Sequence, residues 1–340
     1  MVLHRKPDFR NMEKVLAREV PDRYTPFEFM LNSTLIQKYA PEVYREPYGF
    51  REYILGEVKA FERLGYDYAM IHASDFHFPT AAKTAKSTIS LNDNAVIWDR
   101  DSFRSCPFTS PAEANRRVLE EAAELLPAGM KLIICGPCGV LENVIALVGY
   151  ENLCMMLYDD EALAEDIFAA VGSRLVEYYT LAINNPAVGA LMSNDDWGFN
   201  TQTMLSPAAM RRYVFPWHKA IVEVAHKAGK PAMLHSCGYF GDIIDDVVDD
   251  MQYDARHSYE DTILPVEQAY EQLHDRIAVL GGIDLNFIAA RTPAEIAARS
   301  QAILRQTAGR GGYALGTGNS VPDYVSEENY LAMHRCVDAD

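Results

Sequence analysis

The sequence is short of basic residues, with 31 Lys and Arg against 48 Asp and Glu in 340 positions and a formal net charge of −17 at pH 7. A chain this acidic repels phosphate backbones and anionic lipid headgroups, because like charges raise the free energy of contact. Nucleic acid and membrane surfaces are therefore not expected as partners. The charge by itself selects no particular substrate.

Long apolar runs and disulfide spacing are also missing. The chain reaches Pro7 and Asp8 without an apolar stretch, so we expect no signal peptide. No apolar run has the length of a membrane span. The 6 cysteines are scattered rather than regularly spaced, which is typical of reduced thiols. A cytoplasmic location is the expectation.

No Gly-x-Gly-x-x-Gly follows the first predicted strands, which argues against a doubly wound sheet that binds a dinucleotide. Low-complexity segments, obvious linkers and internal repeats are absent as well. We therefore expect a single domain over residues 1–340.

Short apolar runs alternate with helical patterns along the whole chain. Helices are expected at 9–19, 51–64, 111–126, 140–184, 206–228, 241–249, 265–273, 292–308 and 326–337. Strands are expected at 24–29, 66–72, 131–135, 188–193, 232–235, 253–257, 276–280 and 312–315. About eight strands separated by helices predict a (β/α)8 TIM barrel with additional N-terminal helices. Residues 80–110 are polar and broken, which predicts an insertion after an early strand, with a small hairpin around 92–94.

Titratable side chains follow most of the predicted strands. Because barrel enzymes place their function at the carboxyl ends of the strands, these side chains predict a polar ring at one rim, which is typical of a catalytic mouth. The strand-end residues are Asp75 and His77, Cys135 and Cys138, Asp195 and Asp196, His235 and Cys237, His257 and Glu260, Asp284, and Asn319.

His235 and Cys237 stand two residues apart at the end of a buried strand, so their side chains point to the same face. Imidazole and thiolate are preferred zinc ligands, and the pair predicts part of a zinc site. A core histidine beside an inert cysteine is the alternative. Cys135 and Cys138, with Gly-Pro between them, favour packing over a redox pair or a metal clip.

Several segments together resemble the uroporphyrinogen decarboxylase superfamily, which includes the decarboxylase itself and the zinc methyltransferases that work with corrinoid proteins. The resemblance covers nearly the whole chain and implies a TIM barrel. Its motifs are PDRYTP (21–26), SNDDWG (193–198), LSP (205–207), HKAGKP (226–231), LHSCG (234–238), GGID (281–284), RTPAE (291–295) and GGYALGTGN (311–319).

The resemblance to the true decarboxylase is incomplete. Its Arg-bearing N-terminal segment is missing, and Thr317 stands where its members carry a His after the last strand. Asp75 matches the family's acidic residue after an early strand, although a loop-capping Asp is the alternative.

The resemblance to the methyltransferase branch implies that His235 and Cys237 are zinc ligands. That branch adds a distant Cys, and none stands near 318–320. The similar cobalamin-independent methionine synthases use a Glu after the next strand. Glu260, which is 23 residues after Cys237, is therefore the expected third ligand, with a solvated loop carboxylate as the alternative.

Roles are also predicted for the other residues at the strand ends. Asp75, Asp195 and Asp196 are the predicted catalytic residues. The residues predicted to bind substrate are His77, Trp197, Phe199, Tyr239, His257 and Asn319. For the aromatic side chains, core packing is the alternative, and for Asn319 it is a turn.

One thiolate, one carboxylate and one imidazole around Zn²⁺ sum to about zero net charge, which makes the metal a good Lewis acid. We therefore expect methyl transfer from a small methylated compound, such as an aromatic methyl ether, to a partner corrinoid protein. The alternative is a metal-free decarboxylase that acts on a cyclic carboxylate. The direction of transfer, the methyl donor and homo-oligomer formation stay open.

Overall fold

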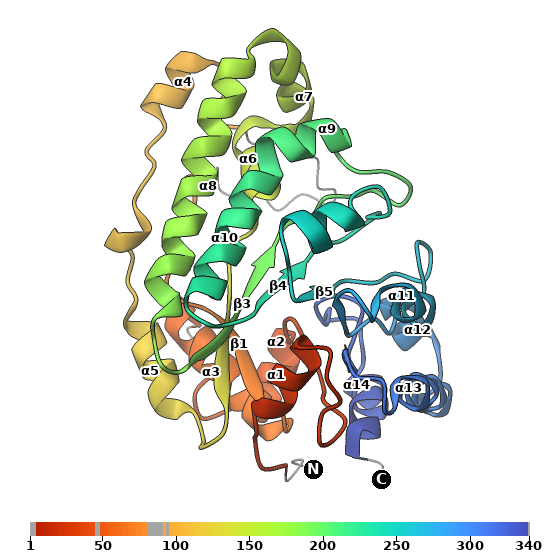
Figure 1. Ribbon diagram of the computed structural model, residues 1–340. Coiled ribbons are helices and arrows are strands. Elements are labelled where there is room, and N and C mark those ends of the chain that lie inside the picture. Colours follow the sequence, from red (N-terminus) through yellow and green to blue (C-terminus); the bar gives the residue numbers. More distant parts are fainter. Residues whose placement is uncertain (1–4, 45–47, 81–90, 93–94, 339–340) are drawn as a thin grey trace.

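The computed structural model describes residues 5–44, 48–80, 91–92 and 95–338 (Figure 1). At its centre is one curled sheet of seven parallel strands, hydrogen-bonded in chain order. The strands are β1 (Tyr68–His72), β2 (Lys131–Cys135), β3 (Val188–Asn194), β4 (Ala232–His235), β5 (Ala255–His257), β6 (Ala278–Leu280) and β7 (Tyr313–Ala314). Their side chains are almost all buried, as in a parallel sheet covered by helices.

Helices connect successive strands and cover the outside of the sheet. They are α1 (Arg10–Leu16), α2 (Ser33–Tyr39), α3 (Phe50–Arg63), α4 (Arg100–Ser105), η1 (Pro111–Glu113), α5 (Arg117–Leu125), α6 (Val140–Val148), α7 (Tyr150–Asp159), α8 (Glu161–Ile183), α9 (Pro207–Ala209), η2 (Met210–Val214), α10 (Phe215–Lys227), η3 (Asp246–Asp250), α11 (Val266–Leu273), α12 (Leu285–Ala290), α13 (Pro293–Thr307), α14 (Glu327–His334) and η4 (Arg335–Asp338).

Local chemistry explains where several of these helices begin. The Thr292 hydroxyl accepts the Glu295 N–H while the Glu295 carboxylate accepts the Thr292 N–H, so α13 starts with a capping box followed by Pro293. The two long helices α8 and α10 lie side by side (Figure 1). They approach closely because Gly172 leaves room for the Trp217 ring, which would lie 2.2 Å from a Cβ at that position.

The expected first strand is not formed as a strand. Residues 24–29 make a single parallel bridge, from Pro26 to Leu315 beside β7. On the side of β1 the backbone of Glu28 pairs with a side chain instead: the Tyr68 hydroxyl accepts the Glu28 N–H (2.6 Å) and donates to the Glu28 carbonyl (2.7 Å). A complete (β/α)8 barrel is therefore not confirmed, because this segment contributes one bridge and a side-chain link rather than a ladder.

Other expectations differ in detail. Helices α2, α4 and α12 were not predicted, and the pattern at 241–249 ends in the single π-helical turn η3. The expected hairpin around 92–94 falls largely outside the described residues, as does much of the insertion after β1. Among the described helices, no single one is long and apolar enough to cross a membrane. One pair bent by 95°, α6 with α7, passes that test by length and composition only.

Candidate metal centre

His235, Cys237 and Asp196 bring together three donor atoms within 4.8 Å of one another. His235 ends β4, Cys237 follows two residues later, and Asp196 follows the end of β3, so neighbouring strands deliver them to one edge of the sheet. The His235 Nε2 and Cys237 Sγ atoms lie 3.6 Å apart. Usual Zn–N and Zn–S bond lengths at a tetrahedral angle give a separation of about 3.6 Å.

A relay of hydrogen bonds fixes which nitrogen of His235 is free. The carbonyl of Thr317 can only accept, so His257 Nε2 carries the proton of their 2.9 Å bond. Burial lowers the pKa of His257 to about 4, so its ring is neutral and its Nδ1 is an acceptor. His235 Nδ1 lies 2.8 Å away and must donate. The lone pair of His235 Nε2 therefore points toward the Cys237 sulfur, as a metal ligand requires.

The ring of His235 is also held in plane by stacking. Phe29 lies parallel to it, with ring centroids 4.0 Å apart and planes 13° apart. His235 is 5 % exposed, and burial lowers its pKa well below the usual value, so the imidazole is neutral and ready to bind a cation. Phe29 comes from the segment that bridges to Leu315, some 200 positions before His235. The sequence did not predict this role for Phe29, because nothing in the residues around it indicates a contact with His235.

The sulfur of Cys237 has an environment set by three side chains. Burial raises the pKa of its thiol, and the charge of Asp196 adds to this effect, whereas the nearby Ser258 hydroxyl and the hydrogen bond from Asn319 act in the opposite direction. The Asn319 amide donates to the sulfur at 3.1 Å. Asp196 Oδ1 accepts the Cys237 N–H at 3.1 Å. The Asn319 bond suits a thiolate under a cation, because an amide donor offsets the negative charge on sulfur.

Glu260, the predicted third ligand, has another contact. Its Oε1 accepts the Gly238 N–H at 3.3 Å, and it is not part of the group of three donors. Gly238 has a φ of +85°, and a Cβ there would lie 2.0 Å from the carbonyl oxygen of Gly198. Glu260 thus contacts the tight turn that follows Cys237, while Asp196 lies with His235 and Cys237 in the group of three donors.

Arg256 is a fully buried cation beneath the same loops. Its guanidinium donates to the carbonyl oxygens of Ser236 (2.9 Å) and Ser258 (2.6 Å) and lies 3.7 Å from the centre of the Phe240 ring. One carbonyl belongs to the loop after β4 and the other to the loop after β5. This one side chain therefore joins the loop that carries Cys237 to the neighbouring loop. The sequence analysis did not single it out.

Asp195 lies on the other side of the backbone from Asp196 and is fully buried. Its carboxylate accepts the N–H groups of Leu141 (2.8 Å) and Glu142 (2.9 Å) at the start of α6, and it pairs with His218 Nε2 at 3.0 Å. His218 is a residue of α10 with no exposed surface. Asp195 therefore anchors α6 and α10 to the β3 loop.

The remaining predicted site residues are spread along the rim. Asp75 is exposed and accepts the Asn115 N–H at 2.8 Å, and His77 lies 3.0 Å from the carbonyl of Asp75. Tyr239 donates to Asp242, while the Phe199 side chain is 40 % exposed. Trp197 is buried against His218 and Phe215, and its Nε1 has no hydrogen-bond partner among the described residues.

Cys135 and Cys138 are not joined by a disulfide. Cys135 is buried at the end of β2, with its sulfur 3.6 Å from His72 Nδ1, and burial raises its pKa. Cys138 is exposed at a φ of +61°. Neither belongs to the group of three donors.

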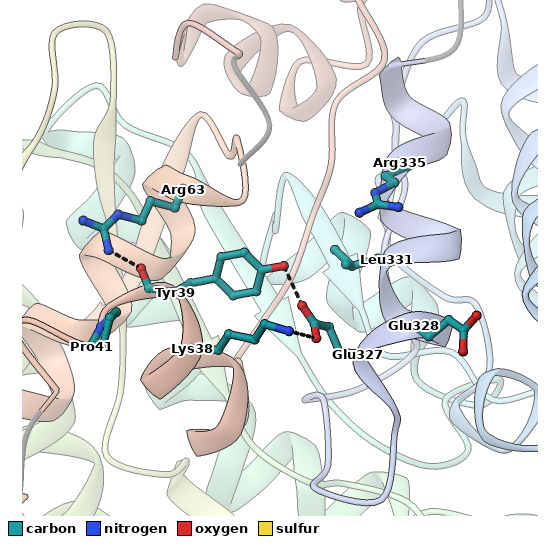
Figure 2. A pocket seen from close by; sticks show the side chains of 8 residues that line it. All are labelled: Lys38, Tyr39, Pro41, Arg63, Glu327, Glu328, Leu331 and Arg335. Atoms are coloured by element: carbon teal, nitrogen blue, oxygen red, sulfur yellow. Dashed lines mark hydrogen bonds and ion pairs between the residues drawn. The ribbon is translucent and has the colours of Figure 1, made fainter. Parts of the chain in front are cut away.

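Two cavities lie away from the three donors. The larger, of about 600 Å³, lies between α2 and α14, where Lys38 and Tyr39 both contact Glu327 and Arg63 binds the Tyr39 carbonyl (Figure 2). The other, of about 500 Å³, includes Arg5, Arg23 and Gly309. Neither is lined by a donor of the candidate centre, so they do not define its substrate.

The protein thus has a curled parallel sheet of TIM-barrel-like architecture, and a His, Cys and Asp group with the geometry of a candidate metal site lies at the carboxyl ends of its strands. The family model for uroporphyrinogen decarboxylase (URO-D) matches residues 57–339, and the chain belongs to this family.

Solved structures agree on the fold. A methyltransferase from Methanosarcina mazei superposes with a TM-score of 0.72 at 15 % identity, covering 98 % of this chain and 99 % of that one. A putative vitamin-B12 independent methionine synthase from Listeria monocytogenes gives a TM-score of 0.53 at 13 % identity, covering 93 % and 98 %. The curated proteins contain no match. At these identities the likeness shows the fold alone.

Proposed function

We propose that this protein is a zinc-dependent methyltransferase that moves a methyl group between a small methylated substrate and a corrinoid protein. The observation that carries the proposal is the convergence of His235 Nε2, Cys237 Sγ and the Asp196 carboxylate, with the imidazole lone pair already directed at the site. The structural likeness to a methyltransferase concerns the fold, so the donor set bears the chemical argument.

The charge of that donor set favours an electrophilic metal. A thiolate and a carboxylate balance the charge of Zn²⁺, and Asn319 donates a hydrogen bond to the sulfur instead of adding a second thiolate. When bound, zinc would supply Lewis-acid polarisation of the substrate's leaving atom. An ether oxygen gains most from this assistance, so an aromatic methyl ether is the proposed donor and the Co(I) of the corrinoid partner the proposed acceptor.

The chain's own residues have separate tasks in this proposal. Asp196, His235 and Cys237 hold the cation, and His257 fixes the tautomer of His235. Asp195 holds the loop after β3 and so positions Asp196. Glu260 holds the turn at Gly238 and so positions Cys237.

The residues proposed to contact the substrate or the corrinoid partner come from several strand ends. They are Asp75, His77, Phe199, Tyr239 and Asn319. Trp197, which the sequence predicted to bind substrate, is buried against Phe215 and His218 and has a packing role instead.

Decarboxylation of a cyclic carboxylate is the competing function. It would need cations that face a bound carboxylate. Arg256, the buried cation of this region, has both terminal nitrogens bound to backbone carbonyls. This leaves it poorly suited to bind a substrate carboxylate, and we favour methyl transfer.

The test mixes zinc-loaded protein with cob(I)alamin and a panel of methyl ethers, methylamines and methyl thioethers under anaerobic conditions. Growth of the methylcobalamin spectrum, abolished by His235→Ala and retained by His226→Ala, would support the proposal. His226 is a suitable control because it pairs with Asp254 on the surface of α10. Carbon dioxide release from a carboxylated ring, without methylcobalamin from any donor, would establish the decarboxylase instead.

A further inference from the structure

Glu28 places a carboxyl group in the interior behind the candidate metal centre. It has no exposed surface and comes from the segment that bridges to Leu315. Its Oε1 lies 2.5 Å from the hydroxyl oxygen of Thr317 and accepts the Phe29 N–H at 3.2 Å. The same Thr317 hydroxyl lies 2.5 Å from the carbonyl oxygen of Asn319.

A count of protons decides the state of Glu28. The Thr317 hydroxyl has one proton, and it lies within hydrogen-bond distance of two oxygens. The Asn319 carbonyl has no proton to give, so it receives the one from Thr317. A neutral Glu28 supplies a second proton and so satisfies both contacts, whereas an ionised Glu28 would compete with the Asn319 carbonyl for the single hydroxyl proton.

The surroundings of Glu28 also favour the neutral form. Its Oε2 is buried with no hydrogen-bond partner among the described residues, a costly arrangement for an ionised group. The titratable groups that face it are the phenols of Tyr66, Tyr68 and Tyr330, and no cation is bonded to it in the described part of the chain. Burial raises the pKa of Glu28 to about 8.

Thr317 and Asn319 connect this carboxyl to the metal centre in two ways. The Thr317 carbonyl accepts from His257, which in turn sets the tautomer of His235. The Asn319 side chain donates to the Cys237 sulfur. The position of residues 317–319 thus controls both the imidazole ligand and the thiolate ligand.

We propose that Glu28 is a positioning residue of the candidate metal centre: as a neutral acid it donates to Thr317 and so holds Thr317 and Asn319 against His257 and Cys237. The inference rests on the metal centre of the proposed function but not on methyl transfer. It requires that residue 28 donates a hydrogen bond and carries no charge.

The experiment compares Glu28→Gln, Glu28→Leu and Thr317→Val in the full chain. Zinc affinity is measured by chelator competition, and the sulfur-to-cobalt charge-transfer band is recorded after Co(II) substitution. A Gln amide also donates and is neutral, so Glu28→Gln should keep the affinity within about threefold. Glu28→Leu and Thr317→Val should weaken it by about tenfold or more and shift the band, as is typical for partners of metal ligands.

Glu57 offers a matched control for damage to the core. It is another buried carboxyl, 2 % exposed, and it bonds to Tyr53 rather than to the site. Glu57→Leu should leave zinc affinity and the cobalt band unchanged even where it lowers the melting temperature. If Glu28→Leu does not fold, Thr317→Val, which keeps the side-chain volume, carries the test.

Two results would overturn the proposal. Equal loss of affinity in Glu28→Gln and Glu28→Leu would mean that the ionised carboxylate is needed, and unchanged affinity in Glu28→Leu or Thr317→Val would remove the positioning role. An infrared difference spectrum of wild type minus Glu28→Gln at neutral pH provides a readout without metal: it should show a protonated carboxyl, and its absence would contradict the neutral form. Failure of the wild type to bind metal would instead refute the metal centre.

Discussion

Two carboxylates, those of Asp196 and Glu260, lie close enough to the Cys237 loop to be considered as zinc ligands. They differ in the atoms that they contact. Asp196 has a carboxylate oxygen within 4.8 Å of both the His235 nitrogen and the Cys237 sulfur. Glu260 instead accepts the N–H of Gly238. These contacts favour Asp196 as the third donor and lead to a direct test.

Asp196→Asn should lower zinc affinity by more than about tenfold, because it replaces an anionic ligand by a weak neutral one. Glu260→Gln should lower it by less than about tenfold, since its amide oxygen still accepts from Gly238. Zinc content after dialysis against a graded chelator measures both. The reverse order of effects would identify Glu260 as the ligand.

Asp195 and Asp75, both predicted catalytic acids, should respond differently to loss of charge. Asp195→Asn breaks a buried contact with His218 and weakens two bonds to the start of α6, so the free energy of unfolding should fall by about 2–4 kcal/mol. Asp75→Asn, at an exposed position, should change it by less than about 1 kcal/mol. Urea denaturation followed by circular dichroism gives both values. Equal stability of the two variants would contradict the anchoring role of Asp195.

At the scale of elements, the segment that precedes α2 is the most consequential for the site. Residues 24–29 bridge β7 at Leu315 and reach β1 only through the Tyr68 hydroxyl. The same segment contributes Phe29, which stacks on His235, and Glu28, which contacts Thr317. A short stretch with little regular structure thus connects both ends of the sheet to the metal centre.

Tyr68→Phe tests this connection. The change removes the hydroxyl and leaves the Glu28 N–H and carbonyl without it, so the free energy of unfolding should fall by about 1–3 kcal/mol. Zinc affinity should fall as well, because Phe29 loses its fixed position. Tyr324→Phe, at an exposed tyrosine, is the control and should change neither quantity. Loss of stability without any loss of zinc affinity would show that the segment supports the fold but not the site.

At the scale of the whole molecule, buried acids give stability a definite dependence on pH. Burial raises the pKa of both Glu28 and Glu57 to about 8. Between the unfolded value near 4.5 and this folded value, the native protein holds protons that the unfolded chain releases. The contribution of each acid is therefore greatest below pH 4.5 and is lost as pH rises toward 8.

The free energy of unfolding should accordingly fall from pH 5 to pH 8, by up to about 1.4 kcal/mol per pH unit for each acid. Glu28→Gln and Glu57→Gln should each flatten the curve, because a neutral amide does not titrate. Urea denaturation at four pH values compares each variant with the wild type, and the contributions of all other groups cancel in the difference. Parallel curves for a variant and the wild type would show that the acid concerned titrates normally.

The sequence alone determined the features that depend on neighbours along the chain. Alternating apolar runs predicted the strands that form β1 to β7, and the helical pattern at 292–308 predicted α13. His235 and Cys237 could be paired because a strand end directs residues two apart to one face. The motifs from 193–198 to 311–319 indicated the family to which the chain belongs.

The tertiary structure alone decided what depends on distant segments meeting. Asp196 joins His235 and Cys237 because the loop after β3 meets the loop after β4, a contact that sequence spacing does not encode. Phe29 and Glu28 reach the centre from the start of the chain, and Asn319 reaches it from near the end. The segment 24–29 has a strand-like pattern but forms only one bridge, because a tyrosine hydroxyl satisfies the backbone where a ladder was expected.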